Sequence, residues 1–188
     1  YNWYSVNDSR NVCPRGWHVP TDSEWNQLVI NIDSSADPSI TGSQSTTAGG
    51  MMKDTGYLYW TSPNTGATNS SEFSALPGGS ISLAVVTQIG DYGYWWSSSE
   101  VNTYNAWVRH LKYNTSSVIR GNAFKEDGFS VRCLKDSNTV SNSNNLQYLW
   151  SNNYTYLWST GETTASISPS PSQTTTYYVT VSNGVTSC

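Results

Sequence analysis

The sequence predicts a mixed α+β domain followed by a small all-β sandwich. An amphipathic helical pattern occurs at residues 21–32, and aromatic-rich strand patterns follow between Tyr92 and Cys133. From residue 139 onward the only charged residue is Glu162, and short Ser-, Thr- and Tyr-rich segments alternate with turn residues, as in a small antiparallel sandwich. We therefore expect a first domain over residues 1–136, a polar linker over 137–145 and a sandwich over 146–188.

The composition narrows the function classes. The 188 residues carry a net charge of −4, which does not favour a nucleic-acid surface, and only 12% of them are charged. No apolar run approaches the roughly 18 residues of a membrane span. Three cysteines without CxxC spacing argue against a zinc site and for one disulfide plus a leftover thiol. We expect a secreted or cell-surface protein with no nucleic-acid partner and no membrane span.

The first residues contain one uncertain and one clear pattern. Tyr1–Val6 reads YNWYSV, and we interpret this apolar opening as a strand whose partner lies outside the given sequence. Thr21 and Glu24 are spaced as a helix capping box. Apolar residues then recur at i, i+3, i+4 and i+7, namely at Trp25, Leu28, Val29 and Ile32. This pattern predicts a short helix packed by one face.

The next part of the chain is poor in regular patterns. Residues 33–50 predict a surface loop or a weak second helix that closes at Gly49 and Gly50. Residues 60–79 have turn residues at nearly every other place, which predicts a long irregular loop. Loops of this length are usually functional, or ordered by a ligand or metal. Residues 81–89 predict a short apolar strand or turn.

Three strands of one buried sheet are predicted between Tyr92 and Cys133. The first contains Tyr94, Trp95 and Trp96. The other two are predicted from alternating rows, formed by Trp107, Arg109, Leu111 and Tyr113 and then by Phe129, Val131 and Cys133. Residues 120–127 look like a polar link to the last strand.

A family resemblance adds to these patterns. CPRGWHVPTDSEW, SPNTGATN, FSALPGG, GYWWSSSE, AWVRHLKYN and GFSVRCLKD occur in this order within residues 1–136. In combination they resemble the Fibrobacter succinogenes major paralogous domain family. The resemblance implies the fold of C-type lectins and formylglycine-generating enzymes, an α+β domain whose ends are tied by a disulfide. It also implies that Cys13 and Cys133 form that disulfide.

The second region has a resemblance of its own. YLWSTGETTASI and TTTYYVTVSNG are similar to phrases in the Ig-like modules of large Bacteroidota surface proteins. The strands that precede a YNWY-like segment in the first family are absent, and the Ig-like region stops at Cys188 before a closing strand. We therefore expect part of a larger surface polypeptide or a repeating assembly, such as a homopolymer, with contacts at Tyr1–Val6 and Tyr177–Cys188.

Candidate ligand-binding residues follow from the lectin resemblance and from the loops. Lectins of this type hold calcium through loop carboxylates and amides, and aromatic rings stack on sugars. The candidates are Trp60, Asn64, Asn69, Glu72, Glu100, Asn102 and Tyr104. The proline-flanked acid-amide triplet and the Trp-Asn-Asp of sugar-binding lectins are missing, so a calcium-free scaffold is favoured over calcium-dependent sugar binding. No metal ligands are assigned.

Enzyme chemistry is not expected. Formylglycine formation needs reactive cysteines held close together, and only Cys188, in the second domain, is left beside the expected disulfide. WSSSE lacks the glycine-framed elbow of a serine hydrolase. Structural or solvated roles are expected for the remaining titratable candidates, which are His18, His110, Glu72, Glu100, Glu126 and Asp127.

These observations lead to an expected function with alternatives. We expect a non-enzymatic adhesion or structural protein of the cell surface. A glycan-binding module of a larger carbohydrate-active or surface protein is the alternative. A third hypothesis, a formylglycine-generating enzyme, requires a reactive thiol besides the disulfide.

Overall fold

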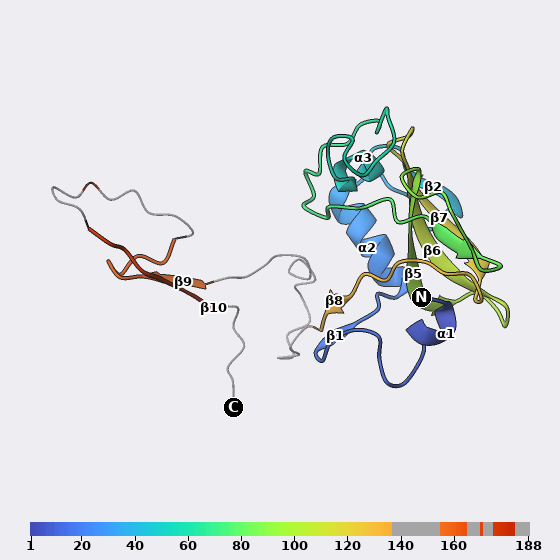
Figure 1. Ribbon diagram of the computed structural model, residues 1–188, viewed down its shortest axis with the longest axis horizontal. Coiled ribbons are helices and arrows are strands. Elements are labelled where there is room, and N and C mark those ends of the chain that lie inside the picture. Colours follow the sequence, from blue (N-terminus) through green and yellow to red (C-terminus); the bar gives the residue numbers. More distant parts are fainter. Residues whose placement is uncertain (137–154, 165–169, 171–174, 183–188) are drawn as a thin grey trace. The chain divides into compact units, whose positions relative to one another are not determined.

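The computed structural model describes residues 1–136, 155–164, 170 and 175–182. The chain divides into two compact units, Tyr1–Asn138 and Thr139–Cys188 (Figure 1). The elements of the first unit are, in chain order, α1 (Trp3–Val6), β1 (Trp17–His18), α2 (Asp22–Ile32), β2 (Gly42–Ser45), α3 (Ala48–Met52), β3 (Ser80–Ser82), β4 (Val85–Thr87), β5 (Tyr92–Glu100), β6 (Asn105–Lys112), β7 (Val118–Phe124) and β8 (Leu134–Lys135). The expected linker, residues 137–145, lies outside the described residues.

A four-stranded antiparallel sheet with the order β2-β7-β6-β5 forms the centre of the first unit. In the register of β5 and β6, Trp95 lies opposite Arg109, and Trp96 lies opposite Val108. Successive side chains of a strand point to opposite faces, so these two pairs belong to opposite faces of the sheet. Each face supports a different part of the core.

Helix α2 covers the face that carries Trp95 and Arg109. Its Trp25 is fully buried and lies against the rings of Trp95 and Phe73, with centroids 6.5 and 5.8 Å away. Helix α1 covers the other face, where Trp3 packs in a core cluster with Trp96. In Figure 1, α2 runs beside the sheet and α1 lies near the N-terminus on the other side of β5.

The predicted helix over residues 21–32 is confirmed. Thr21 accepts a hydrogen bond from the Glu24 amide, and the Glu24 carboxylate accepts one from the Thr21 amide. Trp25, Leu28 and Val29 form the buried stripe. The expected Cys13–Cys133 disulfide is also present, and it joins residues 120 apart in sequence.

The prediction of a strand at Tyr1–Val6 is wrong. Residues Trp3–Val6 form helix α1, because Asn2 caps the helix by accepting from the Ser5 amide, and Trp3 and Val6 face the core at a helical spacing of three. The backbone of Tyr1 bonds within the chain: its amine donates to the Phe129 carbonyl, and its own carbonyl accepts from the Phe129 amide.

Two further local predictions are also wrong. The third strand of the sheet is β7 (Val118–Phe124), which overlaps the segment interpreted as a polar link, while Phe129 and Val131 lie outside any strand. The strand pattern of β7 was not recognised because its centre consists of Arg120, Gly121 and Asn122, which are not apolar strand formers. Gly49 and Gly50 lie inside α3 instead of ending it, and a Cβ on either would collide with the backbone of Ser117 or Gly66.

The expected fold class is contradicted. Strand makes up 31% of the structure and helix 13%, in small antiparallel sheets, so an α+β C-type-lectin-like domain followed by an Ig-like sandwich does not describe it. The reason is that α2 is the only helix of more than five residues among those described. In the second unit, the described residues contain one two-stranded sheet, β9 (Thr155–Trp158) with β10 (Val179–Ser182), and no second sheet facing it.

Candidate functional site

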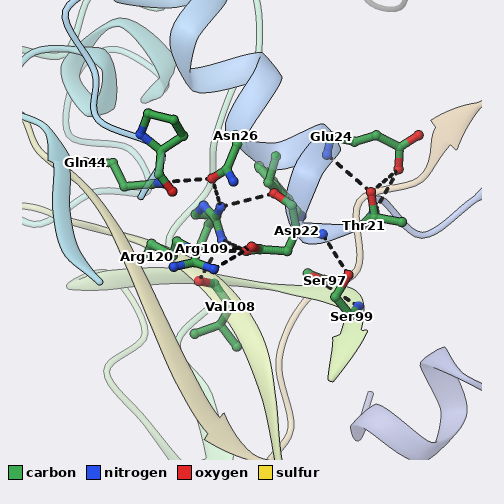
Figure 2. A network of polar contacts seen from close by, with 12 residues as sticks. Thr21, Asp22, Glu24, Asn26, Gln44, Ser97, Ser99, Val108, Arg109 and Arg120 are labelled. Carbon is green, nitrogen blue, oxygen red and sulfur yellow. Dashed lines mark hydrogen bonds and ion pairs between the residues drawn. The ribbon is translucent and has the colours of Figure 1, made fainter. Parts of the chain in front are cut away.

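A polar network joins the first turn of α2 to the central sheet. The Asp22 carboxylate accepts from Arg109 Nη1 at 2.7 Å and from Arg120 Nη2 at 2.7 Å (Figure 2). Arg109 Nη2 also donates to Asn26 Oδ1 at 2.6 Å, and that oxygen accepts from Gln44 Nε2 as well. We call Asp22, Asn26, Gln44, Arg109 and Arg120 the Asp22 network.

The charged groups of the Asp22 network pair with one another. Arg109 is 1% exposed, and the Arg120 guanidinium lies 3.5 Å from the centroid of the Trp107 ring. Burial alone would raise the pKa of the Asp22 carboxyl, but the bonds to Arg120 and Arg109 outweigh burial and lower that pKa. An ionised Asp22 held between two guanidiniums is a structural tie between α2, β6 and β7.

Lys53 forms a second internal site. It is 0% exposed, and its Nζ lies 2.9 Å from the carbonyls of Thr65 and Thr115, with those of Lys112 and Tyr113 at 3.2 and 3.4 Å. Burial lowers the pKa of Lys53 to about 8, so at pH 7 the amine still carries its charge and three protons. The ammonium fills a cage of carbonyl oxygens that joins residues 65 and 112–115.

The long irregular segment 60–79 is ordered by the chain's own groups. Trp60 is 2% exposed and donates from Nε1 to the Ala75 carbonyl, so its ring is part of the core. Asn64 donates to the carbonyls of Asp54 and Gly56. The side chain of Asn69 donates to Ser74 Oγ and accepts from the Ser74 amide. The amides predicted as ligand groups therefore hold the loop itself.

The other predicted ligand residues lie elsewhere. Thr65, next to Asn64, donates its amide to the carbonyl of Tyr113, which follows the last residue of β6. The Asn102 side chain instead accepts from the amide of Asn105, the first residue of β6. The eight residues of β6 separate these points by roughly 25 Å. Glu100 accepts from Lys125 Nζ at 2.6 Å, and Tyr104 is 73% exposed. The structure therefore divides the candidates into two groups.

The remaining candidate, Glu72, has an exposed side chain. It lies in segment 60–79 with a φ of 59°, and its amide donates to the Asn69 carbonyl. Within the residues that the structure describes, no three His, Cys, Asp or Glu side chains converge as a metal site would require. In the same residues, no helix has the length and apolar character needed to cross a bilayer.

The two histidines have different surroundings. His18 Nδ1 lies 2.6 Å from Asp136, and its Nε2 lies 3.0 Å from Glu24, the carboxylate of the capping box. Burial lowers the pKa of His18, but its bonds to Asp136 and Glu24 outweigh burial and raise it above 6.5. Burial lowers the pKa of His110 to about 4, so this ring, packed on Tyr94, is neutral at pH 7.

The most unusual surface of the first unit is the hairpin of β3 and β4. Leu83 at its tip is 95% exposed, and Ile81, Val85, Val86 and Ile89 are between 44% and 68% exposed. No charged residue occurs between Glu72 and Asp91. We call Ile81, Leu83, Val85, Val86 and Ile89 the apolar hairpin surface. The sequence pattern predicted a strand or turn here, but not its exposure.

The turn of this hairpin is strained. Ser82 pairs with Val85, so Leu83 and Ala84 form a two-residue loop, and their φ values are 51° and 64°. A loop of this kind favours Asn-Gly, because residues with a Cβ are costly at positive φ. Backbone strain of this kind is characteristic of functional segments. An apolar dipeptide at this position was the sequence signal that could have identified the surface.

A second exposed apolar segment is found nearby in the sequence. Tyr57, Leu58 and Tyr59 are each more than half exposed. The Thr61 amide donates to the Gly90 carbonyl at 2.9 Å, which holds this segment beside the end of the apolar hairpin surface. The exposed side chains of the first unit thus include two neighbouring apolar segments.

Comparison with known proteins gives one result. The family described as Fibrobacter succinogenes major domain matches residues 1–135. No curated protein and no solved structure matches the chain.

Proposed function

The chain belongs to the Fibrobacter succinogenes major domain family, and from this premise we propose that it is a non-enzymatic, secreted or cell-surface protein that acts by adhesion or as a structural component. The single observation that carries this proposal is the apolar hairpin surface. The largest apolar patch on a soluble monomer, typically about 300–600 Å², is often the surface that another molecule contacts.

The use of the titratable groups supports a non-enzymatic role. Asp22, Arg109 and Lys53 are engaged by internal partners, and His110 is neutral and half-buried. Cys133 is held in the disulfide, so it cannot supply the thiol of a formylglycine-generating reaction. A nucleophile with a base and an orienting group does not occur among these residues.

The disulfide supports a place outside the cytosol. Structural disulfides persist in oxidising compartments, and this one joins the buried Cys13 to the half-buried Cys133. That chemistry supports a secreted or surface-attached location. An adhesive contact would then be made in a medium where the disulfide is stable.

The test combines location with binding. Intact cells of the source bacterium are labelled with a membrane-impermeant biotin reagent, and we expect the chain to be labelled without lysis. The purified chain should then bind those cells, and Val85→Ser with Val86→Ser should reduce binding while His18→Gln leaves it unchanged. Labelling only after lysis, or substrate turnover that one substitution abolishes, would contradict the proposal.

Glycan binding is a second candidate because three of the exposed tyrosines lie in loops between helices and strands of the first unit. Tyr57 and Tyr59 flank one residue of the same short segment, and Tyr104 lies at the turn between β5 and β6. Exposed rings of this kind stack on sugars. On a glycan array, Tyr57→Ala with Tyr59→Ala should remove binding, with Tyr4→Ala on α1 as the matched control. Binding that persists in every tyrosine variant would exclude this candidate.

A further inference from the structure

We propose that two copies of this chain pair through strand β4, antiparallel and edge to edge, about a twofold axis at Val86. This inference rests on the proposed contact function and names its partner as a second copy. The pairing would place Val85 opposite Thr87 of the second copy, with the turn residue Leu83 next to the segment that follows Thr87 in that copy. It would extend the two-stranded sheet β3-β4 into a sheet of four strands.

The backbone of β4 has the geometry that this pairing needs. The amide and carbonyl of Ile81 both bond to Gly128, on the side of β3 away from β4. Val86 lies opposite Ile81, so its own amide and carbonyl point away from β3. Among the described residues none bonds to these two groups. A second Val86 related by a twofold axis would satisfy both, amide to carbonyl in each direction.

The edge of β4 has none of the usual protection against pairing. Soluble proteins protect exposed edges with charged side chains, proline or a bulge. Strands β3 and β4 contain no proline and no charge, and their register from Ser80 to Val85 is regular. An edge that lacks all three devices is a template for another strand.

The side chains complete a self-complementary patch. Ile81 and Val86 point to one face of the hairpin, so a twofold axis would align Ile81, Val86, Val86 and Ile81 in one row of β-branched cross-strand neighbours. The residues of the apolar hairpin surface are between 44% and 95% exposed, so pairing would bury apolar area in both copies. A specific interface needs roughly 1,000 Å² in total, which is about 500 Å² from each copy.

Charge favours a second copy as the occupant. Each chain carries a net charge of −4, so two copies repel each other over most of their surfaces. The region between Glu72 and Asp91 is uncharged, and there two copies meet without a like-charge contact. A partner strand rich in charge would gain no ion pair at this edge. The hairpin of a second copy is uncharged as well, and it would place apolar Val86 against apolar Val86.

The strained turn fits this assignment. Leu83 holds a positive φ that glycine would adopt at lower cost, yet its side chain is almost fully exposed. In the paired arrangement this side chain would lie next to the segment that follows Thr87 in the second copy. The Leu83 side chain would then stabilise the dimer, which offsets the backbone strain that Leu83 causes in the separate chain.

Sedimentation velocity of the full 188-residue chain, from micromolar to millimolar concentration, tests the pairing. We expect a concentration-dependent dimer. Val86→Lys puts two ammonium groups side by side on the axis and should weaken association by more than about tenfold, whereas Val86→Thr keeps the branched shape and should weaken it less.

Two glycine variants separate association from folding. Leu83→Gly and Ala84→Gly both relieve positive φ and should raise the unfolding temperature, but only Leu83→Gly removes a contact side chain and should weaken the dimer. A chain that stays monomeric at every concentration, or a dimer that Val86→Lys leaves intact, would overturn the pairing. The surface-labelling experiment would decide the location of the chain independently of either result.

Discussion

Segment 60–79 and the hairpin of β3 and β4 follow each other in the chain and differ in what orders them. The segment contains no helix or strand, yet Trp60, Asn64 and the cage around Lys53 fix it from inside the first unit. The hairpin is a regular antiparallel pair, yet its side chains are exposed and its turn is strained. Regular backbone pairing and burial are therefore independent sources of order here.

The difference also explains which region is available for contact. In segment 60–79, the side-chain amide nitrogens of Asn64 and Asn69 donate to partners within the same unit, so a ligand would have to displace those bonds. In the hairpin, a partner could contact the exposed apolar side chains and the backbone groups of Val86 without breaking a bond among the described residues. The irregular region is closed to partners and the regular one is open.

The strongest expected effect is at Lys53. Lys53→Met keeps the apolar stem but removes the only donor to the Thr115 carbonyl among the described residues and leaves the Thr65 carbonyl with the Ser116 hydroxyl alone, and we expect a loss of about 3 kcal/mol in the free energy of unfolding. Urea denaturation measures this loss. Lys135→Met, at an exposed lysine, is the control and should change stability little. Equal effects of the two variants would mean that the cage does not order the segment.

Asn64 provides a smaller effect within the same segment. Asn64→Ala removes the bonds to the carbonyls of Asp54 and Gly56 and puts alanine at a φ of 43°, and we expect a loss of about 2 kcal/mol. Asn64→Gly removes the same bonds without the φ penalty and should cost less. The difference between the two variants, measured by thermal unfolding, isolates the backbone contribution. A larger loss for glycine would contradict this account.

The hairpin should respond in the opposite direction. Ala84→Gly places glycine at a φ of 64°, and we expect the free energy of unfolding to rise by about 1 kcal/mol. Calorimetry at a concentration where the chain is monomeric measures this gain. A loss of stability at position 84 would show that the turn is not strained.

The smallest effect concerns His18 and depends on pH. A histidine whose folded pKa is raised stabilises the fold below pH 6.5, and this contribution disappears as the pH rises through the folded pKa. His18→Gln should therefore cost more at pH 5.5 than at pH 8.5. Because the side chain is 37% exposed, the difference should stay below about 1 kcal/mol. Denaturant titrations at both values measure it, and a cost independent of pH would refute the role of the charge.

Local signals in the sequence predicted helix α2 but not helix α1. The capping box of Thr21 and Glu24 and the spacing of Trp25 and Leu28 depend on neighbours within two turns, so helix α2 was predictable. The disulfide followed from the family resemblance. Helix α1 was missed because the apolar residues of YNWYSV suit either state, and contacts with distant Phe129 and Lys125 select the helix.

The candidate site was less predictable because distance through space decides it. Nothing in the sequence places Asn64 and Asn102 at opposite ends of β6, or surrounds Lys53 with carbonyls from two other segments. The exposure of Leu83 was equally hidden, since an apolar residue after a strand pattern normally predicts burial. These features exist only once β6 and its neighbours are assembled.

The Cys13–Cys133 disulfide has a mechanical consequence for a chain pulled from its two ends. Tension entering near Tyr1 would pass through the sulfur atoms and leave at residue 133, so the enclosed residues, with the sheet and the Lys53 cage, would bear no load. Reduction would release up to roughly 400 Å of additional contour length, at about 3.3–3.6 Å for each of the 120 enclosed steps. Under load, the residues between Cys13 and Cys133 form an inextensible link, and the hairpin within it keeps its shape while the residues outside it are stretched.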